Sequence, residues 1–311
     1  MQPLTLKTAI GTYGHTKALK DGSITPQGFT FDHVEVTPII AAFRRMIRNL
    51  EFDISEMAIS TYLCARAFDK PITAIPIFPL RAFQHGSILV NTKSGVEKPT
   101  DLHGKKVGVR AYTVTGGIWV RGILANQYGV DLDQVTWVVP DEEHVSEFPL
   151  PKNVEKVAPE SDLKEMLLSG DVAAAIGTGP MDSPDIKPLI ENPTEAALAF
   201  YRQTNVYPIN HMVVIKNSVI EQHPGVPSAL FDAFARAKRE YMQKLNAGTD
   251  LTPQDEAMVK TKSQVGDPIP YGVAANRPAL ATMIRYNVQQ GIIPRNYNVE
   301  ELFHSTTLNQ E

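Results

Sequence analysis

Short apolar runs that fit β-strands alternate with one-sided apolar patterns that fit α-helices along most of the chain. Residues 33–37 and 52–57 have the pattern of strands, and Phe43, Met46 and Ile47 fall on one face of the helix expected between them. Further strands are expected at residues 107–109, 135–139 and 172–176. Regular alternation of strands and helices is typical of the α/β class. The pattern therefore predicts an α/β protein.

The same pattern predicts two lobes. An extended segment at residues 87–90 is followed by a polar loop, and near residues 206–215 a polar loop passes into a strongly apolar strand. We expect these places to be crossings between a discontinuous first lobe, residues 1–90 plus 212–311, and a second lobe, residues 91–211. Two lobes joined by two crossings predict a hinged clamshell. Each lobe would be a mixed sheet flanked by helices, and the ligand cleft would lie between them.

Composition restricts the class of protein further. With 311 residues, 43% of them apolar, the chain is long enough for two domains with cores of their own. The net charge of −4 and the lack of basic runs interleaved with aromatic residues exclude nucleic acid as the expected partner. No stretch approaches the roughly 20 apolar residues that span a bilayer. The first residues lack the pattern of a secretory signal, and Cys64 is the single cysteine, so we expect a cytoplasmic protein without a membrane partner.

A strand–loop–helix unit at residues 105–122, KKVGVRAYTVTGGIWVRG, has the features of an anion site. Tyr112, Thr113, Thr115 and two glycines lie where the helix is expected to begin. The unpaired N–H groups and the positive dipole end of a helix favour a carboxylate or a phosphate there. An ordinary strand-to-helix turn with threonine caps explains the unit equally well.

Polar side chains gather where strands are expected to end, which is where open α/β sheets bind ligands. They are mainly hydroxyls, arginines and histidines, a set that suits a small aromatic or aliphatic carboxylic acid. The candidates are Tyr13, His15, Glu56, Ser60 and Arg81 in the first part of the chain, His85 near the first crossing, Arg110, Tyr112, Thr113, Thr115 and Trp119 in the second lobe, and Asn210 and His211 near the second crossing.

Several candidates also have a structural explanation. The two arginines fit exposed surface positions, and His85 fits a hydrogen-bonded structural histidine. Glu56 fits a cap of the following helix, and Trp119 fits a core position as well as a wall against a flat ring. His211, by contrast, lies at the expected second crossing, where packing gives little reason for an imidazole. We therefore favour a function for His211.

The sequence does not support a metal or nucleotide site. The spacings HxH, HxxxH, HExxH and CxxC are missing, as are GxGxxG, GxxxxGK[ST] and GxSxG. The acidic run DEEH at residues 141–144 is expected in a solvated loop. We expect no metal and no cofactor, although a metal site assembled from distant histidines and carboxylates stays open.

Longer segments add a resemblance to these patterns. They are EFDISEMAISTYL at residues 51–63, AIPIFPLRAFQHGSILVN at 74–91, DLHGKKVGVRAYTVTGGIWVRGIL at 101–124, DPIPYGVAANRPAL at 267–280 and IIPRNYNVEELF at 292–303. Together they resemble the 4,5-dihydroxyphthalate decarboxylases, a family similar to type II periplasmic binding proteins. The opening GTYGHTKAL departs from the acidic or arginine-bearing turn expected in the family, which leaves the substitution pattern of the substrate open.

The resemblance implies a type II periplasmic-binding-protein-like fold and the non-oxidative decarboxylation of a hydroxylated aromatic acid, for example 4,5-dihydroxyphthalate to protocatechuate and CO2. A ring hydroxyl para to the leaving carboxylate supplies electron density, and a general acid protonates the ring carbon, so no cofactor is implied. The partner is a small aromatic carboxylate. Either His85 or His211 is the acid, with Glu56 or the other histidine accepting a hydrogen bond from the ring hydroxyl.

The resemblance also implies a division of the two carboxylates of such a substrate. An arginine should hold the carboxylate that stays, because equal stabilisation of the leaving one in the ground state gives no gain in rate. We assign Arg110, Thr113 and Thr115 to the retained carboxylate. The leaving one is expected to face a less polar wall such as Trp119 or Phe83.

Other interpretations stay open. A non-catalytic solute-binding receptor of the same fold would bind an aromatic or organic acid, and it would need a signal peptide or a lipid anchor. A pyrimidine synthase of the thiamine pathway shares the broad fold but has a cysteine-rich signature that this chain lacks. Another member of the family would act on a different hydroxylated di- or tricarboxylic acid. The oligomeric state is open too, a homo-oligomer included.

Overall fold

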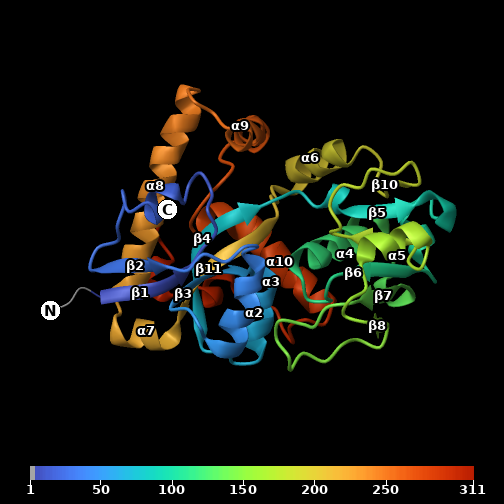
Figure 1. Cartoon of the computed structure of the whole chain (residues 1–311), viewed down its shortest axis with the longest axis horizontal. Coiled ribbons are helices and arrows are strands. Elements are labelled where there is room, and N and C mark those ends of the chain that lie inside the picture. Colours follow the sequence, from blue (N-terminus) through green and yellow to red (C-terminus); the bar gives the residue numbers. More distant parts are fainter. Residues whose placement is uncertain (1–3) are drawn as a thin grey trace. The chain divides into compact units, whose positions relative to one another are not determined.

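Two β-sheets organise the chain, and each belongs to its own unit (Figure 1). The structure is a computed structural model that describes residues 4–311. Unit 1 comprises Met1–Arg81, Ile209–Ala281 and Tyr297–Glu311, and unit 2 comprises Ala82–Pro208 and Thr282–Asn296. Because each unit combines a mixed sheet with helices, the expected α/β class is confirmed.

Unit 1 holds a five-stranded sheet in the order β2–β1–β3–β11–β4. Its strands are β1 (Leu4–Ala9), β2 (Phe29–His33), β3 (Ile54–Ala58), β4 (Ile72–Arg81) and β11 (Ile209–Lys216). β1 runs parallel to β2 and β3, whereas β11 runs antiparallel to β3 and β4. The carboxyl ends of β1, β3 and β4 and the amino end of β11 therefore meet at one edge of the sheet.

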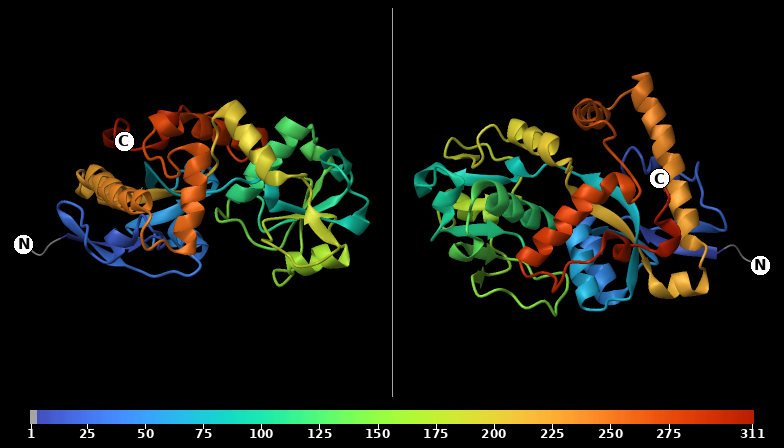
Figure 2. Two further views of the ribbon diagram at one scale, coloured as in Figure 1. Left: turned by 90° about the horizontal axis from the view of Figure 1, so that it is seen from above. Right: turned by 180° about the vertical axis from the view of Figure 1, so that it is seen from behind.

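Helices cover the sheet of unit 1 with apolar faces. The long α8 (Val226–Ala247, orange in Figures 1 and 2) buries Phe231 and Phe234 in one cluster with Ile75 of β4 and Val213 of β11. Further helices are α1 (Lys17–Lys20), α2 (Ile40–Asn49), α3 (Ile59–Ala67), α7 (Asn217–Gln222) and α9 (Pro253–Val265). The apolar face expected on α2 is confirmed, because Phe43, Met46 and Ile47 are buried.

Unit 2 holds a six-stranded sheet in the order β10–β5–β9–β6–β7–β8. Its strands are β5 (Ile88–Asn91), β6 (Lys106–Val109), β7 (Thr136–Val139), β8 (Val154–Lys156), β9 (Ala174–Ile176) and β10 (Ile186–Pro188). α4 (Thr115–Tyr128) and α5 (Leu163–Ser169) lie on opposite faces of this sheet (Figure 2), and α6 (Pro193–Thr204) follows β10. Because β6 and β7 are parallel, the loops after them leave from the same edge.

The boundaries of the units differ from those expected at residues 90 and 212. Residues 82–90 belong to unit 2, because β5 pairs with β9 and β10. Residues 209–211 belong to unit 1, because β11 begins at Ile209, which pairs with Arg81 of β4. Pairing between strands that are distant in the sequence decides both boundaries. The local pattern of apolar and polar residues carries no information about which strands pair.

The segment 282–296 was expected in the first lobe and belongs to unit 2. It includes the second half of α10 (Arg277–Gln289), where the Tyr286 ring meets Trp119 of α4 edge-on at a centroid distance of 5.6 Å. Packing of this aromatic pair thus joins the segment 282–296 to a helix more than 150 positions earlier in the chain.

Within residues 4–311, no helix has both the length and the apolar character needed to cross a membrane.

Candidate functional site

The buried carboxylate of Glu56 is the centre of a hydrogen-bond network in unit 1. Oε1 accepts from the hydroxyl of Tyr13 at 2.7 Å and from Nδ1 of His211 at 2.5 Å, and Oε2 accepts from the backbone N–H of Gly11 at 2.8 Å. Glu56 pairs with Val213 across β3 and β11, and His211 lies two residues from Val213 on the same face. The strand ends thus bring together three residues predicted for the site.

A tight turn after β1 places Tyr13. The hydroxyl of Thr16 donates to the carbonyl of Gly11 at 2.8 Å and accepts from the backbone N–H of Tyr13 at 2.8 Å. A Cβ on Gly11 would lie 2.8 Å from the Tyr13 ring, so a larger residue would push the phenol away from Glu56. The turn therefore needs glycine at position 11 for close approach.

The network sets the charge of its members. Burial raises the pKa of Glu56, but the hydrogen bond and charge of His211, with the bonds from Gly11 and Tyr13, outweigh burial and lower that pKa. Burial, and then the Glu56 charge, raises the pKa of Tyr13, so the phenol keeps its proton. An ionised carboxylate only accepts hydrogen bonds, so Nδ1 of His211 carries the hydrogen and Nε2 is the ring nitrogen left for another partner.

His15, predicted to contact the substrate, is instead buried against aromatic rings. The Tyr13 ring stacks on it at 5.5 Å with an interplanar angle of 5°, and Tyr241 and Tyr271 lie at 6.1 and 6.4 Å. Burial lowers the pKa of His15 to about 4. The Glu56 charge and a hydrogen bond with the backbone of Pro79 offset part of this effect. A neutral His15 thus supports the Tyr13 ring from one side, and the two tyrosines are contacts that the local pattern did not reveal.

Arg81 ends β4 at the same edge of the sheet, and Asn276 fixes its direction. Nη2 of Arg81 donates to Oδ1 of Asn276, whose amide nitrogen donates to the carbonyls of Pro270 and Gly272 at 3.0 and 2.6 Å. Asn276 is 1% exposed. The pattern of strand ends did not single out Asn276 as a positioning residue, although it lies in the segment PYGVAANR that carries the resemblance.

The other two predicted residues of unit 1 lie beside this network in the chain. Ser60 is wholly buried in the first turn of α3, two residues after β3 ends. Asn210 precedes His211 in β11 and is partly buried. Ser60 therefore lies within the packed interior rather than at the exposed edge of the sheet.

In unit 2, the loop before α4 binds a carboxylate that belongs to the chain itself. Oε1 of Glu143 accepts from the backbone N–H of Tyr112 at 2.6 Å, and Oε2 accepts from the backbone N–H of Thr113 at 2.9 Å and from its hydroxyl. Glu143 and His144 are buried, so the expectation of a solvated acidic loop was wrong for these two residues. The backbone N–H groups of Tyr112 and Thr113 and the Thr113 hydroxyl hold the Glu143 carboxylate in the interior. The sequence around Glu143 gives no sign of these donors, because they lie about 30 positions earlier in the chain.

The remaining candidates of this unit have partners of their own. Nη1 of Arg110 donates to Oδ2 of Asp141 at 3.0 Å, in a pair whose side chains are 37% and 36% exposed. Thr115 is buried in the first turn of α4, and Trp119 is wholly buried in that helix. Arg110 and Thr113 thus bind carboxylates of the chain itself, where we expected the carboxylate of a substrate. Of the two positions that the sequence allowed for Trp119, the structure shows the core position.

His85 also belongs to the interior of unit 2. Its Nε2 donates to Oε1 of Gln127 at 3.1 Å, and its ring lies 5.5 Å from that of Phe200. Burial lowers the pKa of His85, and the bond to Gln127 offsets part of the effect. This environment is that of a hydrogen-bonded core histidine. Within residues 4–311, no three His, Cys, Asp or Glu side chains are grouped as a metal site requires.

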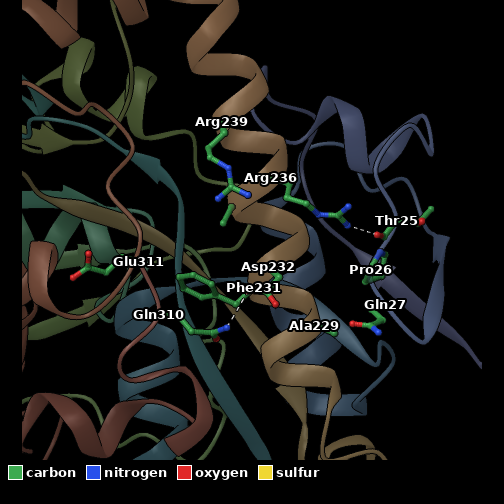
Figure 3. A pocket seen from close by; sticks show the side chains of 11 residues that line it. Thr25, Pro26, Gln27, Ala229, Phe231, Asp232, Arg236, Arg239, Gln310 and Glu311 are labelled. Carbon is green, nitrogen blue, oxygen red and sulfur yellow. Dashed lines mark hydrogen bonds between the residues drawn. The ribbon is translucent and has the colours of Figure 1, made fainter.

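A hollow of about 660 Å³ in unit 1 is lined by none of the predicted residues (Figure 3). It lies between residues 25–27, one side of α8 and the C-terminal residues. Arg236 on its wall donates to the carbonyl of Thr25, and Gln310 donates to Oδ1 of Asp232 at 3.1 Å. Two polar pairs of this hollow are thus engaged with each other, and the candidate site remains the Glu56 network.

Known proteins are similar to the chain in sequence and in fold. It is 30% identical over 332 aligned positions to the 4,5-dihydroxyphthalate decarboxylase of Comamonas testosteroni, a match that covers 99% of this chain and 98% of that protein. It is 33% identical over 221 positions to the protein of the same name from Pseudomonas putida, covering 65% of this chain and 83% of that one. No family model matches.

A solved structure of similar fold is the periplasmic aliphatic sulphonate binding protein of Escherichia coli. The TM-score is 0.57 at 12% identity, with 99% of this chain and 100% of that chain covered. At this identity the similarity concerns the fold alone. The expected periplasmic-binding-protein-like fold is confirmed.

Proposed function

The chain belongs to the 4,5-dihydroxyphthalate decarboxylase family and is a carboxy-lyase, and we propose that it removes CO2 from a hydroxylated phthalate-type acid with His211 as the proton donor. 4,5-Dihydroxyphthalate, with protocatechuate as the product, is the substrate to test first. The observation that carries the proposal is the buried Glu56 carboxylate bound to Nδ1 of His211. The bond fixes the direction of the imidazole and leaves Nε2 as the ring nitrogen that can meet a substrate.

The proton and the electrons of the reaction balance without another reactant. Nε2 of His211 delivers its proton to the ring carbon that bears the leaving carboxylate, and electron density from the para hydroxyl supplies the new C–H bond. The C–C bond then breaks, its electron pair restores the aromatic ring, and CO2 departs. Each turnover consumes one proton, which His211 regains from solvent. The hydrogen bond to Glu56 holds the imidazole in place before and after Nε2 gives up its proton.

We propose Arg81 as the group that holds the retained carboxylate. Its guanidinium lies at the same sheet edge as His211 and is held by Asn276. A guanidinium fixed in direction can bind a carboxylate through two parallel N–H bonds. Arg110 and Thr113, our choice from the sequence, bind Asp141 and Glu143 instead. Binding the retained carboxylate orients the ring without stabilising the one that leaves.

The test compares two histidine variants in mass-resolved product analysis with 4,5-dihydroxyphthalate, with and without a chelator. His211→Asn should lower kcat by roughly 10²–10⁴-fold, because general acid catalysis contributes about that much. The matched control, His85→Asn, should keep kcat within about tenfold, because His85 bonds Gln127 in the core of unit 2.

Three results would contradict the proposal. If His211→Asn kept the kcat of the wild type while His85→Asn lost it, His85 would be the acid. Tight binding of the acid without release of CO2 would indicate a solute receptor. Loss of turnover on chelation would mean that a metal takes part and that the role of the histidines must be revised.

A further inference from the structure

The loop before α4 has the donors of an oxyanion site, and a side chain of the same unit occupies them. We propose that Glu143 is a built-in ligand of this site and that it excludes carboxylates from outside the chain. The inference concerns this loop of unit 2 alone, and it stands independently of the proposed decarboxylation. It predicts that removal of the Glu143 side chain turns the loop into a binding site for a small free carboxylate.

The geometry is that of a bound carboxylate ion. Each oxygen of Glu143 faces its own backbone donor, Tyr112 at 2.6 Å and Thr113 at 2.9 Å, and the Thr113 hydroxyl adds a third donor. Successive backbone N–H groups that converge on one anion form a concave binding site that does not depend on the side chain carrying the charge. The positive end of α4, which begins two residues after Thr113, adds to the attraction.

A second observation in unit 2 indicates an anion at this place. Arg121 is wholly buried, its guanidinium lies 4.1 Å from the centroid of the Tyr112 ring, and Nη2 donates to the Tyr112 carbonyl at 2.5 Å. Nη1 of Arg121 has no hydrogen-bond partner among residues 4–311. Burial lowers the pKa of Arg121, and its interactions with Tyr112 and then with the Glu143 charge offset part of this effect. Arg121 would keep the site positive in a chain that lacks Glu143.

The loop that carries Glu143 is anchored on both sides of it. The backbone N–H of Asp141 donates to the carbonyl of Arg110 at 2.9 Å, and the Phe148 ring stacks on the Tyr112 ring at 6.4 Å with an interplanar angle of 14°. A tethered carboxylate has a high effective concentration at its own site, so free carboxylates at millimolar concentration do not displace it. Glu143 therefore closes this oxyanion site to carboxylates from outside the chain.

The experiment removes the internal carboxylate and offers a free one. Thermal unfolding of Glu143→Ala is recorded with increasing sodium formate at constant ionic strength, with chloride as the balancing anion. We expect a lower Tm than in the wild type and a rise of about 3–5 °C once formate reaches about ten times its Kd. ¹³C-formate NMR should show saturable binding to the variant and none to the wild type.

Two further variants separate the site from loss of charge in general. Glu160→Ala removes an exposed carboxylate and should show neither the loss of Tm nor the response to formate. Glu143→Gln keeps the volume of the side chain but places an amide nitrogen against one donor. Its Tm should fall, and formate should not restore it, because the site is filled.

Three results would overturn the proposal: a folded Glu143→Ala that responds to formate no more than to chloride, a wild type that binds formate as well as this variant does, or a Glu143→Gln with the Tm of the wild type. The last result decides the question even if Glu143→Ala fails to fold. None of these measurements depends on turnover, so they leave the proposed function to its own test.

Discussion

At the scale of single residues, the charge on Glu56 persists in the interior because protein donors replace the water that it has lost. An uncompensated buried carboxylate would take up a proton, but Tyr13, Gly11 and His211 each donate to this one. Tyr13 is itself held by the stack with His15. The chemistry of His211 therefore depends on residues that never need to touch a substrate.

Arg81 and Arg110 allow a matched test of which arginine holds the retained carboxylate. Arg81→Lys replaces a planar fork with a point charge and should raise KM by about 10–100-fold with little change in kcat, since a hydrogen bond to a charged group contributes about 1.5–3 kcal/mol. Steady-state kinetics check this split. Arg110→Lys should leave KM within about twofold, because an exposed ion pair with Asp141 contributes little. A larger effect for Arg110 than for Arg81 would return the role to the loop before α4.

At the scale of elements, close packing between α4 and the end of α10 makes one glycine necessary. A Cβ on Gly122 would lie 2.0 Å from the Tyr286 ring, which is buried and also meets Trp119. Gly116 in the same helix is different, because its Cβ would meet only the end of the Gln84 side chain, at 3.4 Å. Two glycines in one helix are therefore expected to respond in opposite ways to the same substitution.

Gly122→Ala should lower the free energy of unfolding by up to about 2 kcal/mol, measured by urea denaturation. Alanine gains about 1 kcal/mol in helix propensity, but overpacking against the buried Tyr286 ring costs more than this gain. Gly116→Ala keeps the gain in propensity and should be neutral or stabilising. Equal stability of the two variants would mean that Tyr286 moves aside and that α4 and α10 are not closely packed there.

At the scale of the whole molecule, the buried titratable groups make folding sensitive to acid. The pKa of His15 falls from 6.5 to about 4 on burial. Between these values the unfolded chain binds a proton that the folded chain does not, so the free energy of unfolding decreases as the pH falls from 6.5 to 4. Glu56, whose pKa is lowered in the folded chain, acts in the same direction, because its contribution is present above the unfolded value and is lost at lower pH.

We expect His15 alone to account for a loss of about 2–3 kcal/mol between pH 7 and pH 4.5, at about 1.4 kcal/mol per pKa unit. Urea denaturation at the two pH values measures the loss. His15→Phe should remove this part of the pH dependence, because an aromatic ring without a titratable group fills the same space among the tyrosines. His223→Gln, at a partly buried position, should keep it. An unchanged dependence in His15→Phe would show that other groups cause the acid sensitivity.

The α/β class and the elements that meet at the edges of the sheets follow from the amino-acid sequence alone. Hydrophobic periodicity is local, so α2, α8 and the strands β3, β6, β7 and β9 could be predicted from neighbouring residues. A polar residue at the end of a predicted strand is also visible in the sequence. Glu56, His211, Tyr13 and Arg81 are therefore candidates from the sequence, and the resemblance along most of the chain implies a reaction in which they could take part.

Which of these candidates meet depends on tertiary contacts. The bond between Glu56 and His211 joins residues 155 positions apart, and it exists because β11 inserts between β3 and β4. Contacts between residues far apart in the sequence likewise bind Thr113 to Glu143 and Arg81 to Asn276. They also place the segment 282–296 in unit 2. Strand order and the packing of distant rings are set by the free energy of the whole unit. A local pattern of apolar and polar residues therefore indicates which side chains are candidates for a site. Long-range pairing of strands and side chains decides which of these candidates contact each other.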